Sequence, residues 1–132
     1  MQRQNRGTAM ISGGRFRFEE LTIYQDAQAF RKLCQSANQR LSSFSLKNQI
    51  DRATLSVILN IAEGAGRATA LDFARFLKLA TGSISETVAA FDVACREQSI
   101  DQEQFALIYA RALTLTKRVH SFRKNLLLKG GG

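Results

Sequence analysis

Apolar side chains recur at alternating steps of three and four residues along most of this chain, and that spacing limits the folds it can adopt. The longest series comprises Phe105, Ile108, Ala112, Leu115, Val119, Phe122 and Leu126. Such spacing places one apolar stripe on an α-helix, whereas a half-buried strand alternates at every second residue. Proline, which costs about 3 kcal/mol inside a helix, is absent from all 132 residues. The sequence therefore predicts an all-α protein with long uninterrupted helices.

Four helices are predicted, over residues 22–41, 46–63, 71–97 and 101–127. Thr22 is expected to cap the first helix together with Gln25, and Thr69 to cap the third together with Asp72. The second helix is apolar around most of its circumference, which is typical of a helix buried on more than one side. Because the connections are short, consecutive helices should be antiparallel neighbours, so the sequence predicts an up-down-up-down antiparallel four-helix bundle.

The length of the chain indicates a single domain. We expect the bundle to span residues 16–128, between a flexible basic arm (1–15) and a frayed tail (129–132). No apolar run approaches the roughly 18 residues that span a bilayer, and no signal-peptide-like apolar stretch follows the N-terminal arginines. We therefore expect a cytoplasmic protein without a membrane partner. In that compartment Cys34 and Cys95, which fall on apolar helical faces, should be buried free thiols.

The glycine-bearing stretch NIAEGAGR, residues 60–67, raises the question of a phosphate-binding loop. A P-loop requires GxxxxGK[ST] after a strand, and this sequence has neither. Gly64 instead suits the left-handed position that follows a helix end. The stretch is therefore interpreted as a turn between two helices, with a weak contact between Arg67 and an anion at the next helix N-terminus as the alternative.

A polar stripe follows the second and third helices, and we expect its role to be structural. Its members are Arg52, Ser56, Asn60, Glu63, Arg67, Ser83 and Glu86. Antiparallel packing about the turn brings Ser56 level with Ser83, and it predicts an ion pair between Arg52 and Glu86. Gly82, in the same region, is expected to permit close approach of the two helices.

The distribution of charge points to a polyanionic partner. The net charge is +8, and no acidic residue occurs from Gln104 to Gly132. Such an imbalance favours nucleic acid, with solubility or pairing with acids on a neighbouring subunit as alternatives. The expected phosphate contacts are Arg111, Lys117, Arg118, Arg123 and Lys124, assisted by Arg15 and Arg17. Few exposed aromatic side chains are expected, so base stacking should be minor and binding should fall steeply with salt.

No constellation of residues in the sequence indicates catalysis. A Ser/His/Asp set, a pair of carboxylates in a cleft or a cluster of metal ligands would be needed. The single histidine, His120, cannot supply a metal site by itself. We expect no enzymatic activity, no cofactor, no metal and no small-molecule substrate.

Three segments resemble the bacterial four-helix-bundle family whose founding members are encoded in intervening sequences of 23S ribosomal RNA genes. They are FEELTIYQDA (18–27), QIDRATLSVILNIAEGAGR (49–67) and DFARFLKLATGSISE (72–86). The middle segment fits the family pattern QxxRAxxSIxxNIAEGxGR most specifically. The chain departs from the family at Tyr24, where a tryptophan is usual, and at Leu59, where a proline is frequent.

This resemblance implies a ring-like homo-oligomer, often a homopentamer, with no known catalytic activity. A related accessory protein of diversity-generating retroelements forms a similar ring and binds nucleic acid and a reverse transcriptase. By that analogy, the expected partner is structured RNA or an RNA–protein complex. The alternative is a homo-oligomeric protein-interaction scaffold without a direct nucleic-acid role.

Overall fold

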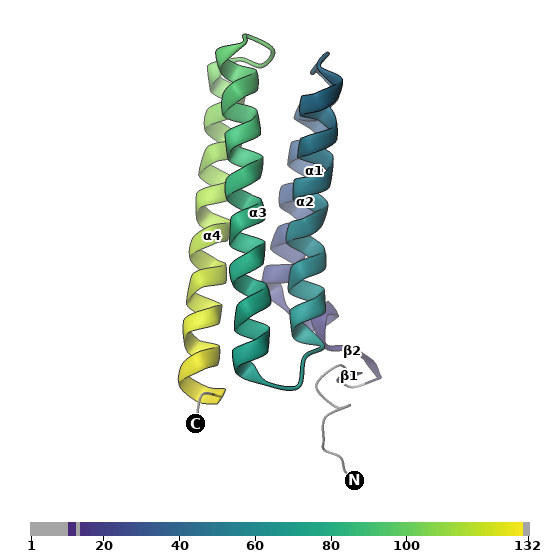
Figure 1. Cartoon of the computed structure of the whole chain (residues 1–132), viewed down its shortest axis with the longest axis vertical. Helices are drawn as coiled ribbons and strands as arrows, with labels where there is room; N and C mark the ends of the chain where they lie inside the picture. The colour runs from purple at the N-terminus through teal and green to yellow at the C-terminus, as the bar shows by residue number, and fades with distance from the viewer. Residues whose placement is uncertain (1–10, 13, 131–132) are drawn as a thin grey trace.

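The structure of the chain is a computed structural model that describes residues 11–12 and 14–130. Its elements are β1 (Ile11–Ser12), β2 (Arg15–Phe16), the 3-10 helix η2 (Arg17–Glu20), α1 (Thr22–Asn38), α2 (Phe44–Ala65), α3 (Ala70–Arg96) and α4 (Gln102–Gly130). The four long helices lie side by side (Figure 1), which confirms the predicted all-α body of four helices. Most of the expected arm (1–10 and 13) and the last two residues of the expected tail lie outside the described residues.

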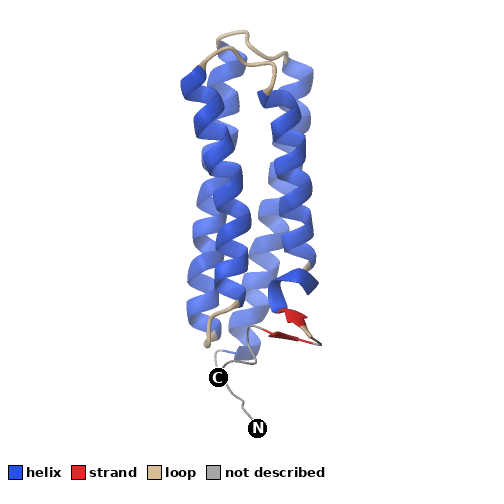
Figure 2. Cartoon of the chain, turned by 90° about the vertical axis from the view of Figure 1, so that its right-hand side faces the viewer, coloured by secondary structure: helices blue, strands red, loops and turns tan. Residues whose placement is uncertain are grey.

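A short β pairing precedes the helices, although the sequence predicted no strand. β1 and β2 are antiparallel, with Ile11 opposite Phe16 and Ser12 opposite Arg15. Gly14 in the connecting turn has a φ of 81°, a conformation that glycine adopts without steric cost. Strands of two residues are too short to produce an alternating pattern. Figure 2 shows them beside one end of the helices.

Each helix contacts two others, so the core lies along a common axis. α1 packs against α2 and α4, and α3 packs against α2 and α4. The largest wholly buried side chains include Phe73, Phe91 and Ile50. Thr54 is also wholly buried: its hydroxyl donates to the Ile50 carbonyl at 2.9 Å and accepts from Arg31 at 3.0 Å. The predicted apolar stripes are therefore the surfaces that form the core.

The first helix starts at the predicted residue but with a different cap, and the second starts earlier than predicted. Thr22 is the first helical residue of α1, and the N-cap is Leu21, whose side chain cannot accept a hydrogen bond. Gln25 reaches back instead to the carbonyl of Glu19, at 3.4 Å. α2 begins two residues earlier than predicted because the Ser43 hydroxyl accepts from the Leu46 amide.

The predicted cap of the third helix is confirmed for Thr69 but not for the Asp72 carboxylate, which accepts from Arg75 instead of completing a capping box. The Thr69 hydroxyl accepts from the backbone amide of Asp72 at 3.1 Å, and α3 starts at Ala70. This hydrogen bond satisfies one of the donors that a helix N-terminus leaves free.

Gly64 has a different role from the one predicted, because α2 continues through it to Ala65 and its φ is not positive. A Cβ at Gly64 would lie 2.7 Å from Phe73 Cδ1 and 2.8 Å from Phe76 Cβ. Glycine is therefore required here for close approach of α3. Gly82 was expected to have that role, yet it is exposed and a Cβ there would have no neighbour within 4 Å.

Among the described residues, no helix has the length and apolar character needed to cross a bilayer.

The two cysteines are free thiols in unequal surroundings. Cys34 is wholly buried in α1, as predicted, whereas Cys95 is only half-buried near the end of α3. Burial raises the pKa of the Cys34 thiol from 9.0 to about 12, and the nearby Arg31 charge opposes this effect. The thiolate is therefore much less favourable in the folded protein than in the unfolded chain.

We expect the stability of the protein to fall with pH above about 9. The unfolded chain loses the Cys34 proton at a lower pH than the folded protein, so the contribution is complete below pH 9 and is lost as the pH rises to about 12. The loss should be about 1.4 kcal/mol per pH unit within this window. Urea unfolding of the protein and of Cys34→Ala at pH 8, 9 and 10 measures it. Equal pH slopes for the two proteins would contradict the assignment.

Candidate nucleic-acid interface

The acid-free part of α4, from Gln104 onward, is a continuous helix whose buried stripe consists of Ile108, Ala112, Leu115 and Val119. The expected cations occupy the remaining circumference in two rows. Arg111 and Arg118 are seven residues apart and lie beside α1, where both line a small pocket with Asp26. Lys117 and Lys124 are also seven residues apart. Because successive residues are about 100° apart around a helix, they form a second row, on the side of α4 that faces away from α1.

Three of the expected phosphate contacts are already used within the molecule. Arg118 forms an ion pair with Asp26 of α1, at 2.9 Å. Arg123 is half-buried and donates from Nε to the Ala74 carbonyl of α3, at 3.0 Å. The Arg17 guanidinium lies over the Phe73 ring, 5.1 Å from its centroid. These three arginines therefore join elements of the fold, which was not predicted.

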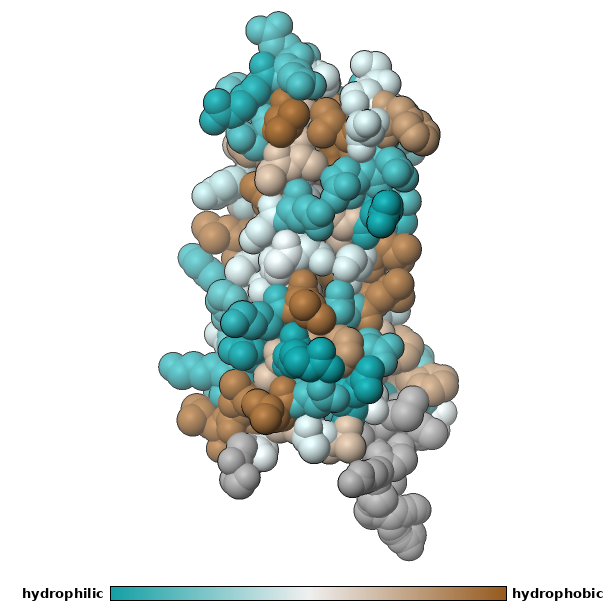
Figure 3. All heavy atoms as spheres, viewed as in Figure 1, coloured by the Kyte–Doolittle hydropathy of each residue, from teal (hydrophilic) through white to brown (hydrophobic). Residues whose placement is uncertain are grey.

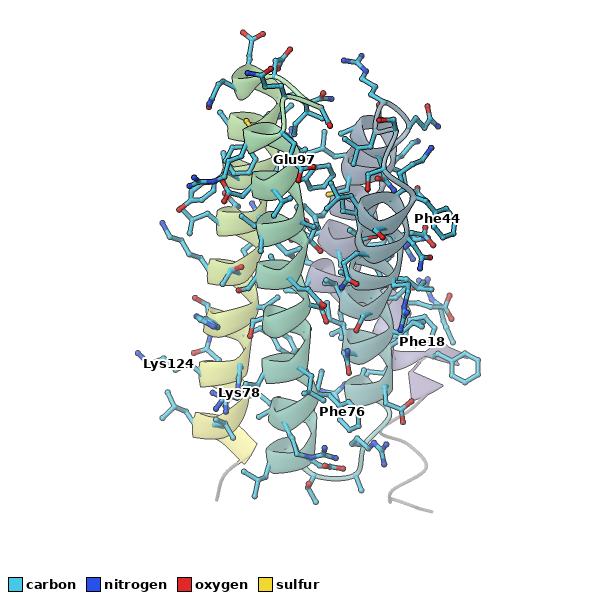
Figure 4. The ribbon with its side chains drawn as sticks, turned by 45° about the horizontal axis from the view of Figure 1, so that its top comes forward. Phe18, Phe44, Phe76, Lys78, Glu97 and Lys124 are labelled. Carbon is cyan, nitrogen blue, oxygen red and sulfur yellow. The ribbon has the colours of Figure 1, made fainter. Side chains whose placement is uncertain are left out.

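Lys117 and Lys124 are exposed, and none of the ion pairs formed within the described residues involves them. The structure adds Lys78 of α3, which is also exposed and outside those pairs and which the sequence analysis missed. Figure 4 shows Lys78 and Lys124 projecting from adjoining helices on one side of the molecule. We name Lys78, Lys117 and Lys124 the lysine cluster.

Charge changes along the α3–α4 pair from one end to the other. The acids of this pair beyond Glu86 are Asp92, Glu97, Asp101 and Glu103, and they surround the α3–α4 turn. The opposite end holds the lysine cluster, the C-terminal end of α4 and the start of α3 (Figure 1). Of the other expected contacts, Arg15 is exposed in β2 and Arg111 is exposed in the middle of α4. The lysine cluster therefore lies away from the acids around the α3–α4 turn, and Asp72, the acid at its own end of α3, is paired with Arg75 at 2.9 Å.

The polar stripe joins α2 to α3, as expected, but with different partners. Ser83 Oγ donates to Ser56 Oγ at 2.9 Å, which confirms the predicted register. Asn60 Nδ2 donates to the Ser56 carbonyl at 2.9 Å. The predicted Arg52–Glu86 ion pair is wrong, because Glu86 accepts a hydrogen bond from Gln49.

The helical repeat explains this difference. Gln49, seven residues before Ser56, is offset from it by about 20° around the helix, whereas Arg52, four residues before, is offset by about 40° in the other direction and is exposed. Register alone was sufficient to place Ser56 but insufficient to choose between two side chains one turn apart.

Arg67 is also held by internal contacts. It pairs with Glu63 at 2.7 Å and approaches Asp72 at 3.7 Å. Its guanidinium lies 4.6 Å from the centroid of the Phe76 ring, as does that of Arg75. Two carboxylates and an aromatic ring therefore hold Arg67 within the fold, although its buried Nε has no hydrogen-bond partner among the described residues.

Exposed aromatic side chains are more numerous than the sequence suggested. Phe44 is 81% exposed, Tyr109 51% and Phe16 50%. These residues do not belong to the predicted apolar stripes, so the spacing of apolar residues gave no indication that they are exposed. Of these three, only Tyr109 lies on α4 with the lysines, so it is the side chain available there for stacking on a nucleobase.

Comparison with known proteins places the chain in a family. The model of the 23S rRNA-intervening sequence protein family matches residues 19–121. A solved structure from Bacteroides thetaiotaomicron, described as a protein of unknown function from the S23 ribosomal protein family, is similar with a TM-score of 0.73. It shares 22% sequence identity, and the alignment covers 78% of this chain and 99% of that one. No curated protein matches. The chain therefore belongs to the 23S rRNA-intervening sequence protein family.

Proposed function

We propose that this is a non-enzymatic protein that binds nucleic acid through phosphate contacts made by the lysine cluster. The observation that carries the proposal is the position of Lys78, Lys117 and Lys124: they are exposed on adjoining helices, outside the ion pairs of the described residues. Structured RNA, or an RNA–protein complex, is the partner we propose. Its negatively charged phosphates are complementary to the positive charge of this surface, while sequence recognition would require separate contacts with bases.

The proposal extends to the assembly of the protein. We take each chain as an up-down-up-down antiparallel bundle. Two contacts support this arrangement, because residue numbers increase in α2 while they decrease in α3: Ser56 contacts Ser83, and Gly64 contacts Phe73. We further propose a ring-like homo-oligomer, with a pentamer favoured by the family resemblance. Repetition of the lysine cluster around a ring would multiply the positive potential that one chain presents.

The salt dependence of binding tests this function. Three phosphate contacts on one chain predict a slope of log affinity against log salt of about −2.1 to −2.7, so affinity should fall about 20- to 40-fold between 50 and 200 mM salt. The measurement is fluorescence anisotropy of a dye-labelled structured RNA titrated with nuclease-treated protein. Nearly constant affinity across this range would contradict the proposal.

An oligomeric protein-interaction scaffold is the second candidate, favoured by apolar side chains on the outer surface of α2 and α3. Leu55 is 40% exposed, Leu59 55% and Leu79 49%. Ser56 of α2 contacts Ser83 of α3. Leu59 and Leu79 each lie about one helical turn from this contact, toward the turn that joins α2 to α3. Figure 3 shows brown hydrophobic groups on this face separated by hydrophilic ones. A defined protein partner that remains bound after nuclease treatment, together with salt-insensitive RNA binding, would favour the scaffold.

A further inference from the structure

An open groove lies between α3 and α4, nearer the α3–α4 turn than the lysine cluster. Its volume is about 500 Å³, and its walls include Val88 and Ala89 from α3 and Phe105, Tyr109 and Leu113 from α4. Most of the buried stripe of α4 lies on the adjacent side of the helix, and of its four members only Ala112 lines the groove.

Tyr109 is the most prominent side chain in the groove. It is 51% exposed, and the next turn of α4 presents Leu113, which is 44% exposed. The Phe105 ring packs edge-on against the tyrosine, with centroids 6.1 Å apart and an angle of 60° between the planes. The tyrosine ring is therefore braced on one side while half of its surface remains available to a flat ligand.

The groove leads directly into the lysine cluster. Tyr109, Leu113 and Lys117 are four residues apart, so they follow one ridge of α4. The helical rise places Lys117 roughly 12 Å along the axis from Tyr109. On α3, Lys78 and Asp92 are fourteen residues apart and so lie on the same side of that helix. Asp92 lines the groove but is paired with Arg96, at 3.0 Å. The aromatic surface and the cations thus form one continuous path.

We propose that this groove binds an unpaired nucleotide, with its base stacked on Tyr109 and its neighbouring phosphates held by the lysine cluster. The inference rests on the proposed function and narrows its target to single-stranded stretches or loops. Every base has a π face that can stack on an aromatic side chain, but a base inside a duplex is covered by its neighbours and cannot enter the groove. The lysine cluster continues the groove, and its members take part in none of the ion pairs of the described residues. This positive charge favours a polyanion as the occupant over a helix from a second copy of the chain.

The test compares Tyr109→Ala and Tyr109→Phe with the unaltered protein. The ligand is a dye-labelled 12-nucleotide RNA of mixed sequence, either single-stranded or annealed to its complement, at low salt. We expect the unaltered protein to prefer the single strand. Tyr109→Ala should weaken single-strand binding by roughly 5- to 150-fold while duplex binding stays unchanged, and Tyr109→Phe should retain both. Because Tyr109 is half exposed, the alanine variant should fold, which its thermal melt checks.

Tyrosine fluorescence can also report directly on stacking against the Tyr109 ring. The chain has no tryptophan and only two tyrosines, Tyr24 and Tyr109. In Tyr24→Phe the intrinsic fluorescence therefore comes from Tyr109. Its emission, corrected for absorption by the RNA, should be quenched by the single strand and not by the duplex.

The outcomes separate this inference from the proposed function. If Tyr109→Ala binds the single strand as tightly as the unaltered protein and binding remains salt-dependent, the groove assignment is overturned and phosphate binding stands. If the unaltered protein binds neither RNA, both proposals fall. If Tyr109→Ala instead lowers the mass measured by light scattering without RNA, a second copy occupies the groove and the inference is overturned.

Discussion

Gly64→Ala should lower the free energy of unfolding by about 1–3 kcal/mol, the usual cost of inserting a methyl group into a packed interior. The new Cβ would stand 2.7 Å from Phe73 Cδ1 and 2.8 Å from Phe76 Cβ. Neither neighbour can yield easily, because Phe73 is buried and is also packed edge-on against Phe122 of α4. The clash should outweigh the gain of up to about 1 kcal/mol that alanine brings to a helix. Urea unfolding followed by circular dichroism measures the difference.

Gly82→Ala is the matched control, because it makes the same substitution in a helix interior without a clash. No atom lies within 4 Å of a Cβ built there, so the variant should be more stable by about 0.5–1 kcal/mol. Opposite signs for the two substitutions would establish Gly64 as the point of closest approach between α2 and α3. Equal stabilisation of both variants would show that α3 can move away from Gly64 at little cost.

The glycine turn illustrates what a sequence can and cannot reveal. The spacing of apolar residues correctly predicted four helices, because burial of one stripe per helix requires that period. It could not tell why Gly64 is glycine, since a left-handed turn and a close contact both require the absence of a Cβ. The contact partner, Phe73, is in the next helix and became identifiable only when α2 and α3 were placed together.

For the candidate site too, the local sequence shows where the cations are but not which of them are paired with residues elsewhere in the chain. The acid-free stretch of α4 was evident from composition, and the exposed Lys117 and Lys124 lie in the second half of that helix. Whether a given cation is available depends on residues far away in the chain. Arg118 is paired with Asp26, which is 92 residues distant, and Lys78 joins the surface only because α3 packs beside α4.

Reversal of the lysine cluster should have the largest effect on binding. In the triple variant Lys78→Glu, Lys117→Glu and Lys124→Glu, three attractive contacts become repulsive, so we expect affinity for single-stranded RNA at 50 mM salt to fall by more than about 100-fold. The slope of log affinity against log salt should become shallower by about 2, since the counterions displaced by three phosphate contacts are no longer released. Anisotropy titrations at several salt concentrations measure both quantities.

A second triple variant separates local contacts from net charge. Lys32→Glu, Arg40→Glu and Arg52→Glu change exposed cations on α1, in the turn after it and on α2, all outside the ion pairs of the described residues. Each reversal changes the charge by two units, so both triple variants fall from +8 to +2. If the lysine cluster contacts phosphates, this control should lose far less affinity and keep its salt slope. An equal loss in the two variants would mean that nucleic acid is attracted by overall charge, and the assignment of an interface to α3 and α4 would be wrong.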